Sequence, residues 1–268
     1  MPTSQEGHDE GRLWGHPQDC RRLAVLVAGL AAGPARAEDH PQSCDVPAYL
    51  LSTDSALPKV EQALKDGRRL DILVVGSRSS TIGMSDGTAA YPARLQAALR
   101  EKLPSVEVNV SVELQIKKTA EEIAPGLEKL VEDRKPTLVI WQTGTVDAMR
   151  SVDLDDFRGA MDDGVAAMQK AGADVVLMNL QYSPRTETMI STSNYLDNMR
   201  VVAQQYDVPL FDRFAIMQQW NESGDFDLFS ASPGIELAKR VHDCLGRALS
   251  TFVIDAAHIS RAELRIQR

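Results

Sequence analysis

The chain has 268 residues, of which 43% are apolar and 25% are charged, and its formal net charge at pH 7 is −9. This composition is typical of a globular chain that forms one sizeable hydrophobic core. The acidic balance argues against a nucleic-acid partner, since a protein that follows a phosphate backbone needs a surplus of Lys and Arg on one face. The sequence shows no metal-ligand spacing, so we expect no metal and no other cofactor.

The first segment of the chain has the pattern of a secretory signal peptide. Two arginines precede an apolar run at 23–32, and the small-x-small triplet 35–37 follows it. A run of about 10 residues is too short to cross a bilayer, which takes about 20. We expect residues 1–37 to be a signal peptide cleaved after Ala37, which leaves a periplasmic or secreted protein without a membrane span. A buried N-terminal helix is the alternative interpretation.

Cleavage after Ala37 would keep two of the three cysteines, Cys44 and Cys244. In an oxidising compartment we expect them to form a disulfide between the start of the mature chain and its closing helix. Two buried free thiols are the alternative. Residues 38–56 are then an N-terminal extension, and residues 57–268 a single α/β domain.

From residue 57 onward, short apolar runs alternate with helical patterns. The first run, 71–75, is apolar at every position after Asp71 and ends at Gly76, as is typical of a strand buried on both faces. A helix is predicted at 91–103, where apolar residues keep helical spacing until Pro104. The same alternation continues with strands at 106–112, 137–141, 174–180 and 208–211, and with helices at 120–132, 157–171, 194–206 and 235–254.

Strands separated by helices predict a parallel sheet with helices on both faces, because crossover connections are right-handed. The expected fold is therefore a three-layer, doubly wound α/β domain with a central parallel sheet of about five strands. In such sheets ligands bind beyond the carboxyl ends of the strands. The loops after the first, third, fourth and fifth strands are the ones in which a site is expected.

The loop after the first strand runs from Gly76 to Gly83 and is rich in serine. Its residues 79–83 read Ser-Ser-Thr-Ile-Gly, which resembles the Ser-x-Thr-x-Gly pattern of the first block of SGNH/GDSL hydrolases. The resemblance implies an SGNH-type α/β fold and makes Ser79 the candidate nucleophile. The family's Asp before the serine is absent and one extra residue follows Gly76, so Ser77 is a second candidate. A serine-rich turn without chemistry, or a phosphate-binding loop, is the alternative.

The end of the third strand resembles the family's third block, Gly-x-Asn-Asp. Here the block reads Gly144, Thr145, Val146 and Asp147, and we expect these residues to line the site, with amides near Ser79 and Gly144 binding the oxyanion. Val146 stands where the family has Asn, which removes a side-chain donor whose loss can cost roughly 3–4 kcal/mol of transition-state stabilisation.

The family's second block also differs, because residues 115–119 stand where a glycine-bearing turn is expected. Lys117 or Lys118 could supply positive charge there, and a surface lysine pair is the alternative interpretation.

The family's final Asp-x-x-His block is absent. His242, inside the closing helix, is the candidate general base, and a structural histidine is the alternative. Its neighbour Asp243 lies about 100° around the helix and cannot easily orient it. The possible orienting carboxylates are Glu222, Asp225, Asp227 and Glu236.

Two further segments follow strands at the same edge of the predicted sheet. Tyr182 and Arg185 come after the fourth strand, where Arg185 could hold an anionic or carbohydrate group, or be a surface charge or a salt-bridge partner. Asp212 and Arg213 follow the fifth strand, and we interpret them as an ion pair that braces the loop, without chemistry.

The SGNH resemblance implies an exported serine esterase that acts on a small-molecule or glycan ester, of the envelope-carbohydrate or lipid-like kind. In that interpretation Ser79 attacks the acyl carbonyl and His242 takes its proton. The altered blocks favour a second hypothesis, a catalytically impaired SGNH-like module that binds glycan or a partner in the cell envelope. A flavodoxin-like nucleotide binder is disfavoured, because neither a Gly-x-Gly-x-x-Gly signature nor a Walker loop is present.

Overall fold

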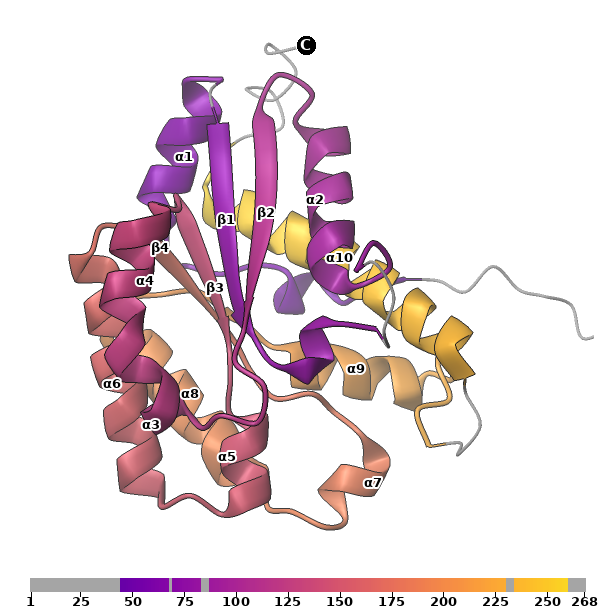
Figure 1. Ribbon diagram of the computed structural model, residues 1–268. Coiled ribbons are helices and arrows are strands. Elements are labelled where there is room, and N and C mark those ends of the chain that lie inside the picture. Colours follow the sequence, from indigo (N-terminus) through magenta and orange to yellow (C-terminus); the bar gives the residue numbers. More distant parts are fainter. Residues whose placement is uncertain (1–43, 68, 83–86, 230–233, 260–268) are drawn as a thin grey trace, which may run out of the picture. The chain divides into compact units, whose positions relative to one another are not determined.

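The computed structural model describes residues 44–67, 69–82, 87–229 and 234–259, all within one compact unit that spans residues 42–268 (Figure 1). The expected signal peptide and the first residues of the expected extension lie outside the described residues. Within the described ranges no helix is both long and apolar enough to cross a membrane.

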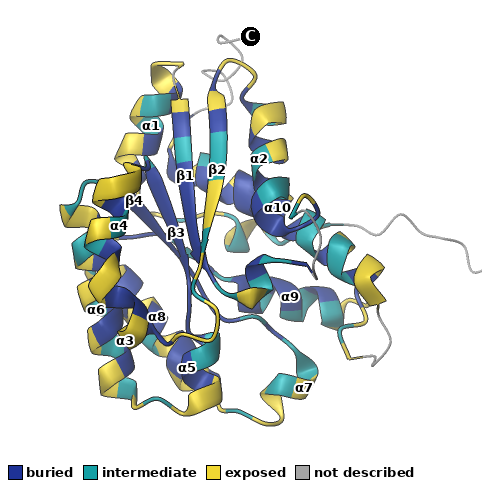
Figure 2. Ribbon diagram, viewed as in Figure 1, coloured by how far each residue is buried: buried dark blue, intermediate teal, exposed yellow. Residues whose placement is uncertain are grey.

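A five-stranded parallel sheet forms the centre of this unit, in the order β2-β1-β3-β4-β5. This arrangement confirms the predicted α/β fold. The strands are β1 (Arg69–Gly76), β2 (Glu107–Leu114), β3 (Leu138–Gln142), β4 (Asp174–Met178) and β5 (Leu210–Phe211). β3 and β4 are buried at every position, whereas half of β2 is exposed at the edge of the sheet (Figure 2).

Helices cover both faces of the sheet. Figure 1 shows α4, α6 and α8 on one face, and α2 and α10 on the other. The main helices are α1 (Pro58–Lys65), α2 (Tyr91–Lys102), α4 (Leu127–Arg134), α6 (Leu154–Lys170), α8 (Ser193–Gln205), α9 (Arg213–Glu222) and α10 (Gly234–Ala256). The shorter ones are η1 (Ala48–Leu50), η2 (Arg78–Ser80), α3 (Ala120–Ile123), η3 (Ala124–Gly126), α5 (Thr145–Arg150) and α7 (Pro184–Glu187).

The helix predicted at 120–132 is wrong as a single element, because it is divided into α3, η3 and α4. Pro125 lies inside the 3₁₀ turn η3 and cannot donate the backbone hydrogen bond that a continuous helix needs. α3 begins with a capping box, in which Thr119 and Glu122 each accept the other's backbone N–H. This cap fixes where the chain turns after β2, at the edge of the sheet where ligands are expected.

Two close contacts hold α10 against the rest of the domain. A side chain at Gly246 would lie only 2.5 Å from Arg94 Cβ, so glycine allows α10 and α2 to approach closely. A disulfide joins Cys244 of α10 to Cys44, across 200 residues of sequence and with a Cα–Cα distance of 5.2 Å. The chain ahead of α1 is thereby fixed to the closing helix, as the sequence predicted.

Candidate active site

Ser79 lies in η2, directly beyond the carboxyl end of β1, and its side chain is half-buried. Its Oγ accepts a hydrogen bond from Gln142 Nε2 at 2.8 Å and a second from Arg213 Nη1 at 3.3 Å. Ser77 Oγ, the second candidate nucleophile, is 3.1 Å from Ser79 Oγ. The first strand therefore places a serine hydroxyl where the sequence predicted one, surrounded by nitrogen donors.

Gln142, the last residue of β3, holds the serine loop in place. Its Nε2 donates to both Ser77 Oγ and Ser79 Oγ at 2.8 Å, and its Oε1 accepts from Ser80 Oγ at 2.8 Å and Tyr91 Oη at 2.9 Å. Together these four bonds fix the orientation of the amide, with Nε2 facing Ser77 and Ser79. The β1–β3 pairing brings Gln142 beside the loop, a neighbour relation that the sequence pattern alone does not show.

Arg213, the first residue of α9, is the functional candidate that the sequence interpretation missed. It is 1% exposed, and its Nε and Nη2 atoms have no hydrogen-bond partner. Among the described residues no carboxylate pairs with it. Burial lowers the pKa of Arg213 to about 10, and the nearby Tyr91 opposes this shift. A charged group buried without a counter-ion costs stability, and such groups collect at functional sites.

The expected ion pair between Asp212 and Arg213 is wrong. Asp212 Oδ1 instead accepts from the backbone N–H of Ala215 at 3.0 Å, as the N-cap of α9, and from Asn179 Nδ2 at 2.7 Å. Its Oδ2 accepts from Arg200 at 3.3 Å. The two side chains have different partners because Asp212 is the N-cap of α9, whereas Arg213 is the first residue inside the helix.

His242 lies near this cluster but is not hydrogen-bonded to Ser79. Its Nδ1 accepts from the backbone N–H of Tyr91 at 2.9 Å, at the start of α2. Burial, together with the positive charge of Arg213, lowers the pKa of His242 to about 4. The imidazole is therefore neutral at pH 7, with its proton on Nε2, because Nδ1 serves as an acceptor.

The carboxylates expected to orient His242 have other partners. They bond as follows: Glu222 with Gln218, Asp225 with Ser223, Asp227 with the backbone of Phe229, and Glu236 with Lys239. Asp243 pairs with Arg247 and Arg94. The described residues therefore contain no Ser-His-carboxylate chain at Ser79.

A cavity of about 450 Å³ opens at Ser79. It is lined by Ser77, Arg78, Ser79, Ile116, Lys117, Thr145, Val146, Met149, Arg150 and Gln181. Thr145 and Val146 thus lie where the third-block resemblance put them. Lys117, not Lys118, is the member of the lysine pair that lines this cavity.

Gly144 and Asp147 have structural contacts next to the cavity. Gly144 has a φ of +90°, and a side chain there would lie 2.6 Å from Leu180 Cδ1, so glycine is required. Asp147 is buried, and its Oδ1 accepts from the backbone N–H of Ala120 at 2.7 Å. Burial raises the pKa of Asp147 above its usual range, and the hydrogen bond from the Ala120 amide opposes this shift. Asp147 therefore joins α5 to the start of α3 beside the cavity.

Tyr182 and Arg185 lie outside this cavity. Tyr182 is buried against Phe214 in an edge-to-face pair with ring centroids 5.2 Å apart. Arg185 Nε donates to the backbone carbonyl of Phe229 at 3.1 Å, and its guanidinium lies 5.9 Å from the Phe229 ring centroid. Arg185 thus links α7 to the segment before α10 instead of facing Ser79.

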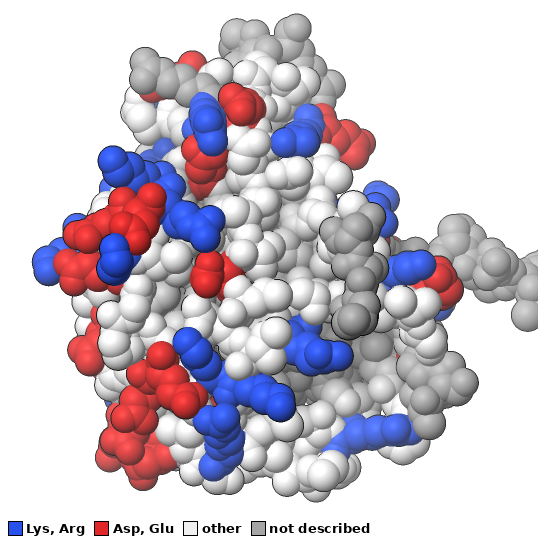
Figure 3. Space-filling view, in the orientation of Figure 1, with Lys and Arg blue, Asp and Glu red and all other residues white. Residues whose placement is uncertain are grey.

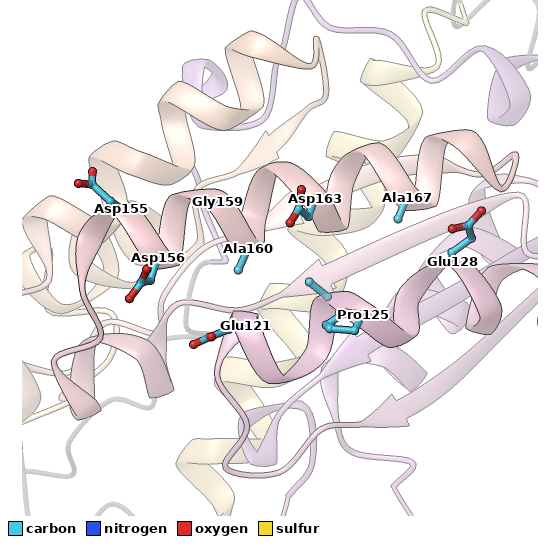
Figure 4. Close-up of a pocket in the computed structure, with 10 residues that line it drawn as sticks. Glu121, Pro125, Glu128, Asp155, Asp156, Gly159, Ala160, Asp163 and Ala167 are labelled. Carbon is cyan, nitrogen blue, oxygen red and sulfur yellow. The ribbon is translucent and has the colours of Figure 1, made fainter.

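A second cavity, of about 580 Å³, lies between α3–α4 and α6 (Figure 4). Five of its lining residues are acidic: Glu121, Glu128, Asp155, Asp156 and Asp163. This acidic cavity shares no lining residue with the cavity at Ser79. The candidate site is therefore the smaller cavity, because it contains the serine cluster. In the described part of the chain no group of three or more His, Cys, Asp or Glu residues is arranged to hold a metal ion.

The sheet order, together with a serine loop after β1 and a Gly-x-x-Asp turn after β3, defines an α/β fold of the SGNH/GDSL hydrolase class. Residues 43–259 match the model of the Non-GDSL lipase-like family, and the chain belongs to this family. No curated protein sequence matches the chain.

Solved structures share the fold at low sequence identity. TesA superposes with a TM-score of 0.55 and 20% identity, over 68% of this chain and 99% of that one. The acetylxylan esterase Axe2 from Geobacillus stearothermophilus superposes with a TM-score of 0.55 and 17% identity, over 69% of this chain and 94% of that one. A two-domain esterase active on acetylated mannans, crystallised with mannopentaose, superposes with a TM-score of 0.58 and 14% identity. The match covers 77% of this chain and 55% of that one.

Proposed function

We propose that the chain is a serine ester hydrolase with Ser79 as its nucleophile. The observation that supports this most directly is the pair of donors, Gln142 Nε2 and Arg213 Nη1, aimed at Ser79 Oγ beside an open cavity. Membership of a lipase-like family and an SGNH-type fold are consistent with the same chemistry.

The two donors explain how Ser79 could react without a hydrogen-bonded base. A hydrogen bond from a cation or an amide stabilises the alkoxide more than the hydroxyl, and so lowers the pKa of the serine. Ser79 then loses its proton to solvent, and the alkoxide attacks the acyl carbon. The bond to the leaving alcohol breaks, the alcohol takes a proton from water, and a second water releases the acid from the acyl-serine.

The oxyanion of this reaction needs its own donors. The backbone N–H groups of Arg78 and Ser79 begin η2, and no acceptor among the described residues receives them. They are the donors we assign to the developing oxyanion, in place of the Asn side chain that Val146 lacks. His242 has a positioning role in this scheme, since its Nδ1 holds the first residue of α2.

The proposed substrate is an acyl ester of a carbohydrate or of a lipid-like alcohol. Structural relatives that act on acetylated mannans and acetyl-xylooligosaccharides support the carbohydrate alternative. We propose that the protein is exported, which the Cys44–Cys244 disulfide supports, because such bonds persist in oxidising compartments.

Turnover of 4-nitrophenyl acetate and butyrate by the purified chain tests the proposal. Wild type should hydrolyse these esters, and Ser79→Ala should lose at least about 100-fold in kcat/KM. Ser77→Ala is the matched control, because Ser77 shares the same Gln142 donor. Labelling with a fluorophosphonate, followed by peptide mass mapping, should locate the modified residue at position 79. Modification of Ser77, or equal rates for Ser79→Ala and wild type, would remove Ser79 from the mechanism.

A second candidate function is a non-catalytic binding module of the cell envelope. The absence of an imidazole or carboxylate hydrogen-bonded to Ser79, among the described residues, favours it. Wild-type protein that neither hydrolyses activated esters nor reacts with the fluorophosphonate would support this alternative over the hydrolase.

A further inference from the structure

We infer that the cavity at Ser79 binds an ester that carries an anionic group, a carboxylate, phosphate or sulfate, next to a short apolar segment. This inference rests on the proposed function for its reaction and narrows the substrate class. Its evidence is the charge and surface of the cavity wall, which the hydrolase proposal does not use.

The charge of the cavity wall is opposite to that of the chain. Three lining residues are cations, Arg78, Lys117 and Arg150, and none is acidic, although the chain has a net charge of −9. Figure 3 shows Lys and Arg side chains gathered around η2 and α5, whereas acidic side chains gather over α3 and α6. Same-sign charges around a concave site concentrate ligands of the opposite sign.

Two of these cations are free to meet a ligand. The side chains of Arg78 and Lys117 have no hydrogen-bond or ion-pair partner in the described part of the chain, and both are exposed. Arg150 is shared with Glu122, at 3.1 Å between Nη1 and Oε2. An arginine is suited to an anion because its planar guanidinium donates two parallel hydrogen bonds to a carboxylate or phosphate.

The backbone holds Lys117 beside the serine loop. Gln115 N–H donates to Gly76 O at 2.7 Å, which joins the end of β2 to the end of β1. Lys118 N–H then donates to Gln115 O at 3.3 Å, and Lys117 inside this turn has a left-handed φ of +63°. A left-handed lysine is disfavoured, so the turn holds it there at an energetic cost.

Arg213 adds positive charge behind Ser79. Its guanidinium is buried, and its Nε and Nη2 have no hydrogen-bond partner among the described residues. Its Nη1 donates to the Oγ of Ser79, which lines the cavity. In a poorly polarisable interior this uncompensated charge is screened less than a surface charge. An anion in the cavity would therefore be attracted by both the rim cations and the buried guanidinium.

The remaining wall is apolar. Ile116 is 45% exposed and Met149 is 63% exposed, and both line the cavity with Val146. Exposed apolar side chains beside cations suit a ligand that has an apolar segment and an anionic group. A neutral acetylated sugar would leave Arg78 and Lys117 unused, which is why we choose the anionic ester.

Two matched ligand pairs test the inference. For turnover, 4-nitrophenyl adipate carries a free carboxylate, and 4-nitrophenyl 6-oxoheptanoate replaces it with a methyl ketone. For binding without an acyl ester, octyl sulfate and the neutral octyl glucoside are titrated calorimetrically at low and high salt. The protein variants are wild type, the double variant Arg78→Gln/Lys117→Gln, and Arg240→Gln, which removes an exposed cation of α10 outside the cavity.

Wild type and Arg240→Gln should prefer the anionic member of each pair by about ten-fold, and the double variant should lose most of this preference. High salt should weaken the preference, because the rim charges are exposed. Equal kcat/KM and equal affinity for the two members would overturn the inference while leaving the hydrolase intact. Selective one-to-one binding of octyl sulfate without turnover of either ester would support the anionic cavity and count against the hydrolase.

Discussion

Arg213 Nη1 lies 3.3 Å from Ser79 Oγ, and the two residues are 134 positions apart in the sequence. The guanidinium is buried, and no carboxylate among the described residues neutralises it. Folding alone would favour an apolar side chain at this position, since a buried ion without a partner is destabilising. A charge retained against that cost is expected where the site uses it.

Arg213→Met should therefore lower the activity without lowering the stability. Methionine is of similar length and uncharged, so we expect kcat/KM for 4-nitrophenyl butyrate to fall by roughly 100-fold, as for loss of one charge-stabilising donor. The free energy of unfolding in urea should stay equal or rise by about 1–2 kcal/mol. Arg213→Lys keeps the charge and should retain more of the activity. A Met variant that is fully active and much less stable would show that Arg213 is structural.

Val146→Asn should increase esterase activity. The position lines the cavity and stands where SGNH hydrolases place an oxyanion donor. Restoring one donor is worth up to about 4 kcal/mol in the transition state, and imperfect placement reduces this, so we expect roughly a 10-fold rise in kcat. Val146→Thr, which keeps the shape without the amide, is the control. A decrease in kcat for the Asn variant, at unchanged stability, would count against an oxyanion at this position.

The predictable part of the fold depends on local pattern. β1, β3 and β4 lie inside the sheet, where both faces are covered, so most of their residues form short apolar runs that predict buried strands. β2 lies at the edge of the sheet, is half exposed, and alternates apolar with polar residues. The continuous helix over 120–132 failed because Pro125 was read as part of a helical pattern. α5 and α7 are too short to show helical spacing.

The candidate site could be predicted only in part, because its contacts join different strands. Ser79 is a candidate on the strength of its motif, but Gln142 lies beside it only because β1 pairs with β3. Arg213 was interpreted through its sequence neighbour Asp212, although the two side chains point to different partners. A better signal was available, since Arg213 directly follows a strand at the edge of the sheet where ligands bind.

His242 should make the protein less stable in mild acid. Its folded-state pKa of about 4 lies below the 6.5 of an unperturbed histidine. The unfolded chain therefore binds this proton first, and stability is lost as pH falls from 6.5 towards 4. At pH 4.5 the loss from this group is about 2–3 kcal/mol relative to pH 7.5. Urea unfolding of wild type and His242→Gln at both pH values measures it, and His258→Gln is the matched control.

The same variant tests the role of His242 in catalysis. Because its Nδ1 accepts from the Tyr91 amide, His242→Gln should keep kcat within about ten-fold of wild type. The wild-type rate should rise with pH without an inflection at an imidazole pKa, since solvent takes the Ser79 proton. A loss of about 1000-fold or more would instead identify His242 as the general base.

The Cys44–Cys244 disulfide should contribute strongly to stability. It closes a loop of 200 residues, so in the chain-entropy model its removal costs up to about 5 kcal/mol. Both cysteines pack with the hydrophobic core, so Cys44→Ala/Cys244→Ala removes the bond without leaving two thiols in the core. Urea unfolding of this variant and of wild type should differ by several kcal/mol, and alkylation of non-reduced wild type should add no mass at either cysteine. Equal midpoints, or two freely alkylated thiols in protein isolated from an oxidising compartment, would contradict the prediction.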